Sequence, residues 1–69
     1  MTTAEKKART LIAGQNTTDL ITQFELTEVS TDEHIYIVRG WLMDELEKRN
    51  PDAFWAWVDS NEESPRKFF

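Results

Sequence analysis

The pair Asn50-Pro51 constrains the fold of this chain more than any other short stretch of its sequence. Proline lacks an amide hydrogen and disfavours a helical conformation in the residue before it, so a helix that reaches Asn50 must end there. The same proline suits the first position of a new helix, asparagine is a preferred N-cap, and Asp52 complements the positive end of the helix dipole. The sequence therefore predicts two helices that meet in an abrupt corner.

The segment before this corner has the clearest helical pattern in the chain. Its apolar residues recur on one helical face at Ile35, Val38, Leu42 and Leu46. We expect the longest helix to run from about Ile35 to Arg49, and the spacing of Ser30 and Glu33 is typical of a capping box just before it. Gly40 interrupts the pattern at a cost of about 1 kcal/mol relative to alanine, which indicates the close approach of another element.

The segment after the corner predicts a shorter helix that ends at about Asp59 or Ser60. Its apolar face is formed by Phe54, Trp57 and Val58. Trp55 lies at the margin of that face, because one helix cannot turn Trp55 and Trp57 fully toward the same neighbour.

Two more helices are predicted in the first half of the chain. Thr2 and Glu5 match a capping box, apolar residues follow at helical spacing, and Gly14 is a natural stop in the left-handed conformation. A second helix is expected to begin at Thr17 or Thr18, either of which is a suitable N-cap.

The sequence does not fix the residue at which this second helix ends. Its apolar face holds Leu20, Ile21 and Phe24, whereas Leu26 and Val29 fall off it. A strand pair of residues 24–29 with residues 35–38 is the alternative, because isoleucine and valine favour strands. The preferred prediction is an all-α fold, a compact bundle of three to four short helices, with residues 1–60 as one domain and residues 61–69 as a tail.

Composition limits the functions open to the chain. Its 69 residues include no cysteine and one histidine, so disulfides, thiolate zinc sites and histidine-rich metal clusters are excluded. We find no catalytic set and no cofactor motif, and we expect no enzyme activity, no cofactor and no metal site. The net charge of −5 disfavours binding to nucleic acid or to anionic membranes, and no apolar run is long enough to span a membrane. The lack of cysteine and of a signal peptide predicts a cytoplasmic protein.

Aromatic residues are the candidates for function. Trp41, Trp55, Phe68 and Phe69 are expected to contact a partner, because tryptophan in particular is enriched at interface hot spots. The alternative for Phe68 or Phe69 is that it folds back onto the core while Arg66 and Lys67 remain in water. The expected function is that of a non-enzymatic interaction or accessory domain. Its partner would be a protein, either foreign or a second copy in a homodimer.

A second function remains open from the sequence. Two helices joined by a short turn have the shape of a helix-turn-helix motif, which suggests a small DNA-binding regulator. However, the presumed recognition helix opens with Asp32 and Glu33, whose carboxylates repel phosphates.

The second half of the chain also resembles a known group of sequences. The run VRGWLMDELEKRNPDAF, residues 38–54, is followed by Trp57 and a closing Pro65-Arg66-x-Phe68. This pattern is similar to short uncharacterised proteins of Gram-positive bacteria and of their phages or mobile elements. The resemblance implies a genetic context and carries no established activity.

Overall fold

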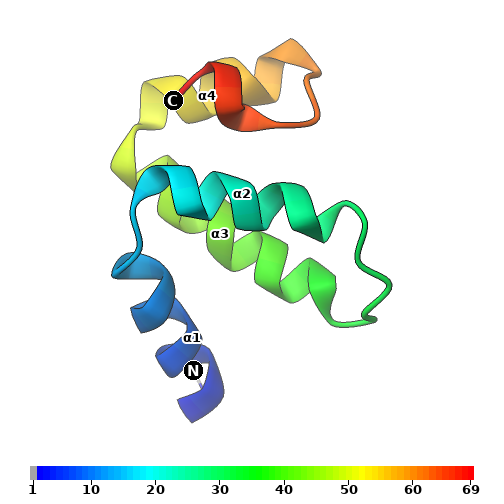
Figure 1. Ribbon diagram of the computed structural model, residues 1–69. Coiled ribbons are helices and arrows are strands. Elements are labelled where there is room, and N and C mark those ends of the chain that lie inside the picture. The colour runs from blue at the N-terminus through cyan, green and yellow to red at the C-terminus, as the bar shows by residue number, and fades with distance from the viewer. Residues whose placement is uncertain (1) are drawn as a thin grey trace.

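The computed structural model describes residues 2–69 and is helical, as predicted (Figure 1). It consists of α1 (Thr3–Ala13), α2 (Thr17–Thr27), α3 (Ile35–Arg49), α4 (Pro51–Ser60) and a short 3-10 helix, η1 (Pro65–Lys67). No strand occurs among these residues, and α2 continues to Thr27. The alternative of a strand pair is therefore wrong.

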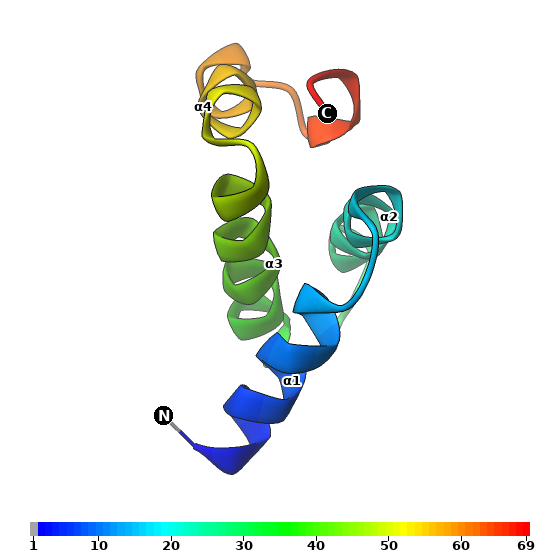
Figure 2. The same ribbon diagram turned by 90° about the vertical axis from the view of Figure 1, so that its left-hand side faces the viewer.

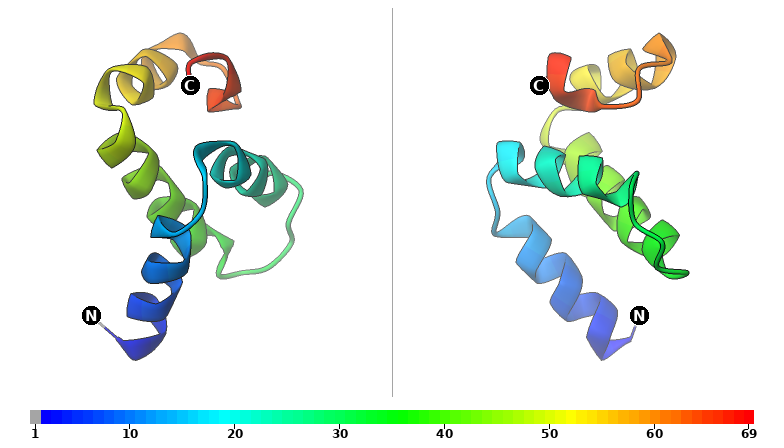
Figure 3. Two further views of the ribbon diagram at one scale, coloured as in Figure 1. Left: turned by 60° about the vertical axis from the view of Figure 1, so that its left-hand side comes forward. Right: turned by 45° about the vertical axis from the view of Figure 1, so that its right-hand side comes forward.

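α3, the longest helix, contacts each of the other three α-helices. α2 packs against α3 along its length, α4 turns across the end of α3 at the corner, and α1 lies beside α3 on another side (Figure 2). The segment after α4 returns so that η1 contacts α2, and it closes the space between α2 and α4 (Figure 3).

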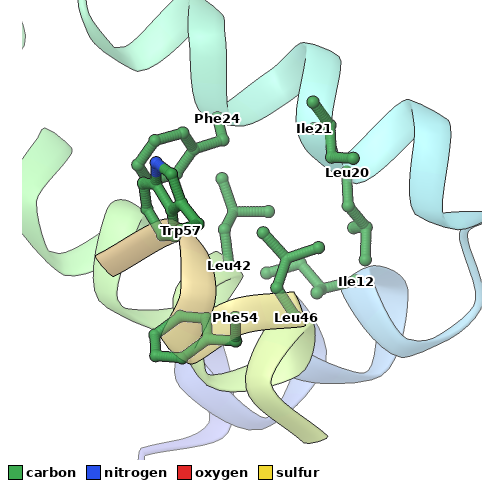
Figure 4. Close-up of a cluster of buried hydrophobic side chains, with 8 residues drawn as sticks. All are labelled: Ile12, Leu20, Ile21, Phe24, Leu42, Leu46, Phe54 and Trp57. Carbon is green, nitrogen blue, oxygen red and sulfur yellow. The ribbon is translucent and has the colours of Figure 1, made fainter. Parts of the chain in front are cut away.

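One apolar cluster joins all four helices. Its buried members are Ile12, Leu20, Ile21, Phe24, Leu42, Leu46, Phe54 and Trp57 (Figure 4). The ring of Trp57 meets Phe24 edge-on at 5.2 Å between centroids and Phe54 at 5.6 Å. Edge-to-face aromatic pairs add to the burial of apolar area, which suits a chain too small to bury a large aliphatic core. α4 thus closes the end of the core with Phe54 and Trp57, as predicted. Val58, predicted on the same face, is instead exposed, so that part of the prediction is wrong.

Side-chain caps set several of the helix starts. The Thr2 hydroxyl accepts a hydrogen bond from the Glu5 amide at 3.1 Å, and the Asn50 side chain accepts one from the Ala53 amide at 3.1 Å, as predicted. The N-cap of α2 is Asn16, which accepts from the Asp19 amide at 2.8 Å, so the expected cap at Thr17 or Thr18 is wrong.

The predicted capping box before α3 does not form. The Ser30 hydroxyl accepts from the Asp32 amide at 3.2 Å, and the Asp32 carboxylate accepts from the His34 amide at 2.7 Å. These local turns use the polar side chains within the loop, and α3 begins only at Ile35 with no side-chain cap. Short polar side chains often satisfy neighbouring amides in this way instead of capping a helix.

Gly14 differs from expectation in its backbone conformation, and Gly40 differs in its surroundings. Gly14 ends α1 as predicted but with φ −83°, in the right-handed region. Gly40 lies on the exposed face of α3, and a Cβ atom there would meet nothing within 4 Å. The expected close approach of another element at Gly40 does not occur within residues 2–69.

Arg49 joins the end of α3 to the connection between α1 and α2. Its guanidinium donates to the carbonyl oxygens of Ile12 at 3.3 Å, Ala13 at 3.2 Å and Gln15 at 2.5 Å. It also donates to the Thr17 hydroxyl at 3.2 Å and pairs with Glu45 at 2.9 Å. The last carbonyls of a helix lack partners within the helix, and the negative end of its dipole favours a cation. Arg49 therefore acts as a C-terminal cap for α1 supplied by α3.

The segment after α4 is fixed to the core by polar and apolar contacts. Arg66 forms a bidentate ion pair with Glu25 of α2. Its Nη2 lies 2.7 Å from one carboxylate oxygen and its Nε lies 2.9 Å from the other. The Ser64 hydroxyl donates to the same carboxylate at 2.7 Å. Hydrogen bonds from Arg66 and then from Ser64 lower the pKa of Glu25 to about 2. Pro65 is buried between these contacts, so residues 64–66 are held against α2.

Candidate protein-interaction surface

The structure separates the four aromatic residues that were predicted to contact a partner. Phe68 and Phe69 are half-buried and pack against the core, in line with the alternative that the tail folds back. Arg66 is exposed, as expected, and it also pairs with Glu25. Trp41 is also half-buried, whereas Trp55 is 52% exposed.

Trp41 lines a shallow groove of about 310 Å³ between α1 and α3. The guanidinium carbon of Arg9 lies 6.0 Å from the centre of its ring, and the same guanidinium pairs with Asp44 of α3 at 3.1 Å. These contacts give Trp41 a structural role in holding α1 beside α3. It offers less free surface than Trp55.

Trp55 lies on the outer side of α4. Phe54 and Trp57, on either side of it, both point into the core, so Trp55 is turned away from the core by the helical rotation between neighbours. Its ring meets Phe54 edge-on at 5.3 Å, and its indole N–H donates to the Glu47 carboxylate at 3.2 Å. Val58, one turn later, is 40% exposed. Trp55 and Val58 therefore form an apolar row on the free face of α4, held in place by the core behind it.

Acidic residues border this row. Asp52 precedes Trp55 by three positions and Asp59 follows it by four, which are the spacings of neighbours on a helix surface. Glu47 reaches the indole from α3. We define the α4 face as Glu47, Asp52, Trp55, Val58 and Asp59. It combines a large exposed aromatic with three carboxylates.

The arginines of the chain are paired away from this face. Each of the four arginines forms an ion pair: Arg9 with Glu5 and Asp44, Arg39 with Glu28, Arg49 with Glu45, and Arg66 with Glu25. Within the described part of the chain, neither Asp52 nor Asp59 has such a partner. The α4 face therefore keeps its negative charge.

A second exposed apolar group lies at the opposite end of the α2–α3 pair. Leu26 lies in the last turn of α2 and Val29 in the loop just after it. Tyr36, 79% exposed, lies with Ile37 in the first turn of α3. The sequence indicated part of this group, because Leu26 and Val29 fall off the apolar face of α2. Tyr36 gave no comparable signal, since apolar residues surround it in the sequence.

The α2–α3 unit has few basic groups free for DNA. Arg39 donates to Glu28 at 2.6 Å and to Thr27 at 2.9 Å, and it lies over the ring of Phe24 at 4.5 Å. The exposed face of α3 presents Tyr36 and Gly40, with Lys48 near its end. A recognition helix normally contacts phosphates and bases through several cationic or amide side chains.

Two other features, a metal-binding cluster and a membrane-spanning helix, are absent from residues 2–69. No group of three histidine or acidic side chains is arranged to hold a metal ion there. None of the helices in that range has the length and apolar character needed to cross a bilayer. Comparison with protein families, curated proteins and solved structures gives no match to this chain.

Proposed function

We propose that this chain is a non-enzymatic protein-interaction domain that binds its partner through the α4 face. The observation that carries the proposal is the exposure of Trp55 on a helix whose core contacts are complete without it. A tryptophan held rigidly at the surface can bury a large area at small entropic cost, and truncating such a residue at an interface often costs 2 kcal/mol or more.

The rigidity of α4 supports this role. Its start is fixed by the Asn50 cap, and its inner side is fixed by Phe54 and Trp57 in the core. Trp57 further donates its indole N–H to the Glu62 carbonyl at 2.8 Å, which ties the end of α4 to the next segment. A preorganised surface loses less conformational freedom on binding than a mobile one.

Affinity capture from the source cells tests the proposal with three forms of the domain: wild type, Trp55→Ala and Tyr36→Ala. The third variant is a matched control, because Tyr36 is also a large exposed aromatic on a helix but lies outside the α4 face. We expect a specific protein to be retained by wild type and by Tyr36→Ala and to be lost with Trp55→Ala. All three forms should have similar far-UV circular dichroism. Equal capture by all three would contradict the proposal.

The alternative function, a small DNA-binding regulator, rests on the arrangement of α2 and α3. Retention of duplex DNA at low salt, decreasing as salt rises, would favour this alternative over the proposed one. The proposed origin in a phage or mobile element is tested by the gene neighbourhood: genes of such an element should flank this one.

A further inference from the structure

We infer that the α4 face takes a short basic segment of a partner protein, with a lysine or arginine side chain placed over Trp55. This inference rests on the proposed function and adds the chemistry of the partner. It starts from the apolar row of Trp55 and Val58 and from the charges that border it.

The first step is the local charge. Residues 50–64 contain four acidic residues and no basic one. Of these, Asp52 lies in the first turn of α4, where a carboxylate is favourable, but Asp59 lies in the last turn, where the dipole is negative. Glu62 and Glu63 follow directly, and α4 has no basic residue in its last turn. Lys67, 3.4 Å from Glu62, is the one basic side chain paired with this group among residues 2–69.

The second step is the chemistry of Trp55. A tryptophan ring attracts cations to its face, and arginine is the commonest partner of such rings. Carboxylates at Glu47, Asp52 and Asp59 raise the local concentration of a cationic segment before it docks. The indole N–H, which cannot face a cation favourably, already donates to Glu47. The exposed ring is thus prepared for a positively charged neighbour.

The third step is size. A fully buried tryptophan contributes roughly 150–250 Å², so the half-exposed Trp55 with Val58 offers on the order of 200 Å². A stable protein–protein interface needs about 800 Å² on each side. The area fits a short segment rather than a second folded copy. Two copies that each carry a net charge of −5 would also repel each other.

A displayed library of random 12-residue peptides provides the probe. Selection is made on the immobilised wild-type domain after removal of phage that bind Trp55→Ala. We expect the selected peptides to be enriched in lysine and arginine. A synthetic copy of one of them should bind roughly 30-fold or more weaker to Trp55→Ala, as expected for a tryptophan anchor.

The position of the charge is tested with two double variants that change the net charge equally. Asp52→Asn with Asp59→Asn should weaken binding of the selected peptide roughly tenfold. Asp32→Asn with Glu33→Gln, which removes two carboxylates from the α2–α3 loop, should change it less than about twofold. Equal effects of the two variants would overturn the inference, because attraction would then depend only on net charge.

The two proposals can fail separately in this experiment. Selected peptides that depend on Trp55 but are neutral or acidic would overturn the basic partner and leave the α4 face as the contact surface. A selection without any Trp55-dependent peptide would overturn both. A concentration-dependent dimer that Trp55→Ala abolishes would identify a second copy as the occupant and would overturn the basic segment.

Discussion

Arg49→Lys tests how much the fold depends on one guanidinium. Arg49 contacts three carbonyl oxygens, one hydroxyl and the Glu45 carboxylate, and its side chain is only 21% exposed. Lysine keeps the charge but has a single nitrogen with three donors, so at least two of the five contacts are lost. At about 1 kcal/mol for each lost hydrogen bond, the free energy of unfolding should fall by roughly 2 kcal/mol.

Such a loss is large for a domain of this size. A chain of 69 residues is expected to be stable by about 3–10 kcal/mol in total. A decrease of about 2 kcal/mol should lower the Tm by roughly 8–16 °C. Thermal and urea unfolding followed by far-UV circular dichroism measure both quantities.

Arg9→Lys is the matched control. Arg9 pairs with Glu5 and Asp44 and lies beside the Trp41 ring, but it caps no helix end. Exposed ion pairs contribute little, so this variant should unfold close to wild type. If Arg49→Lys were as stable as Arg9→Lys, the carbonyl contacts of Arg49 would not stabilise the fold and the argument would fail.

Three further predictions concern other parts of the structure. The pKa of Glu25 is lowered from 4.5 to about 2, so the stability that its carboxylate contributes is present above pH 4.5 and is lost as the pH falls through 2. The free energies of unfolding of wild type and Glu25→Gln, measured in urea, should therefore converge as the pH falls over this range. Gly40→Ala should raise the free energy of unfolding by up to about 1 kcal/mol in thermal unfolding, because the new methyl group meets no other atom; a loss would show that this site is not open. Trp57→Ala should cost roughly 3–5 kcal/mol in urea unfolding, whereas Trp55→Ala should cost far less; similar losses would contradict the distinction between core and contact surface.

The helices could be predicted from the sequence where local rules decide them. The Asn50-Pro51 corner formed as expected because capping, the fixed proline φ and the missing amide act within a few residues. Phe54 and Trp57 entered the core because the helical repeat places them on one side. The exposure of Trp55 follows from the same repeat, so the centre of the candidate surface could be found from the sequence.

Contacts between distant residues could not be predicted in this way. Glu25 and Arg66 are 41 positions apart, and no local pattern indicates that the tail returns to α2. The burial of Phe68 and Phe69 depends on that return. The bonds from Arg49 to the end of α1 are also distant, whereas its pairing with Glu45 joins two residues four positions apart on one helix.

Local rules also failed where neighbouring residues compete for one role. Asn16, Thr17 and Thr18 are all good N-caps, and the structure uses Asn16. At Ser30 the polar side chain satisfies a nearby amide in the loop. The helical pattern around Gly40 predicts a packing contact there, but none of α1, α2 and α4 approaches α3 at that position.

The attachment of α1 has a consequence for motion. This helix contributes one buried residue, Ile12 near its C-terminal end, and Arg49 holds the same end. Its N-terminal half extends away from the other helices (Figure 2). Regions with few buried contacts open at a lower free energy than the rest of a protein. Amide hydrogens of α1 should therefore exchange with solvent through local openings that leave α2, α3 and α4 folded, with protection increasing along the helix toward Ile12.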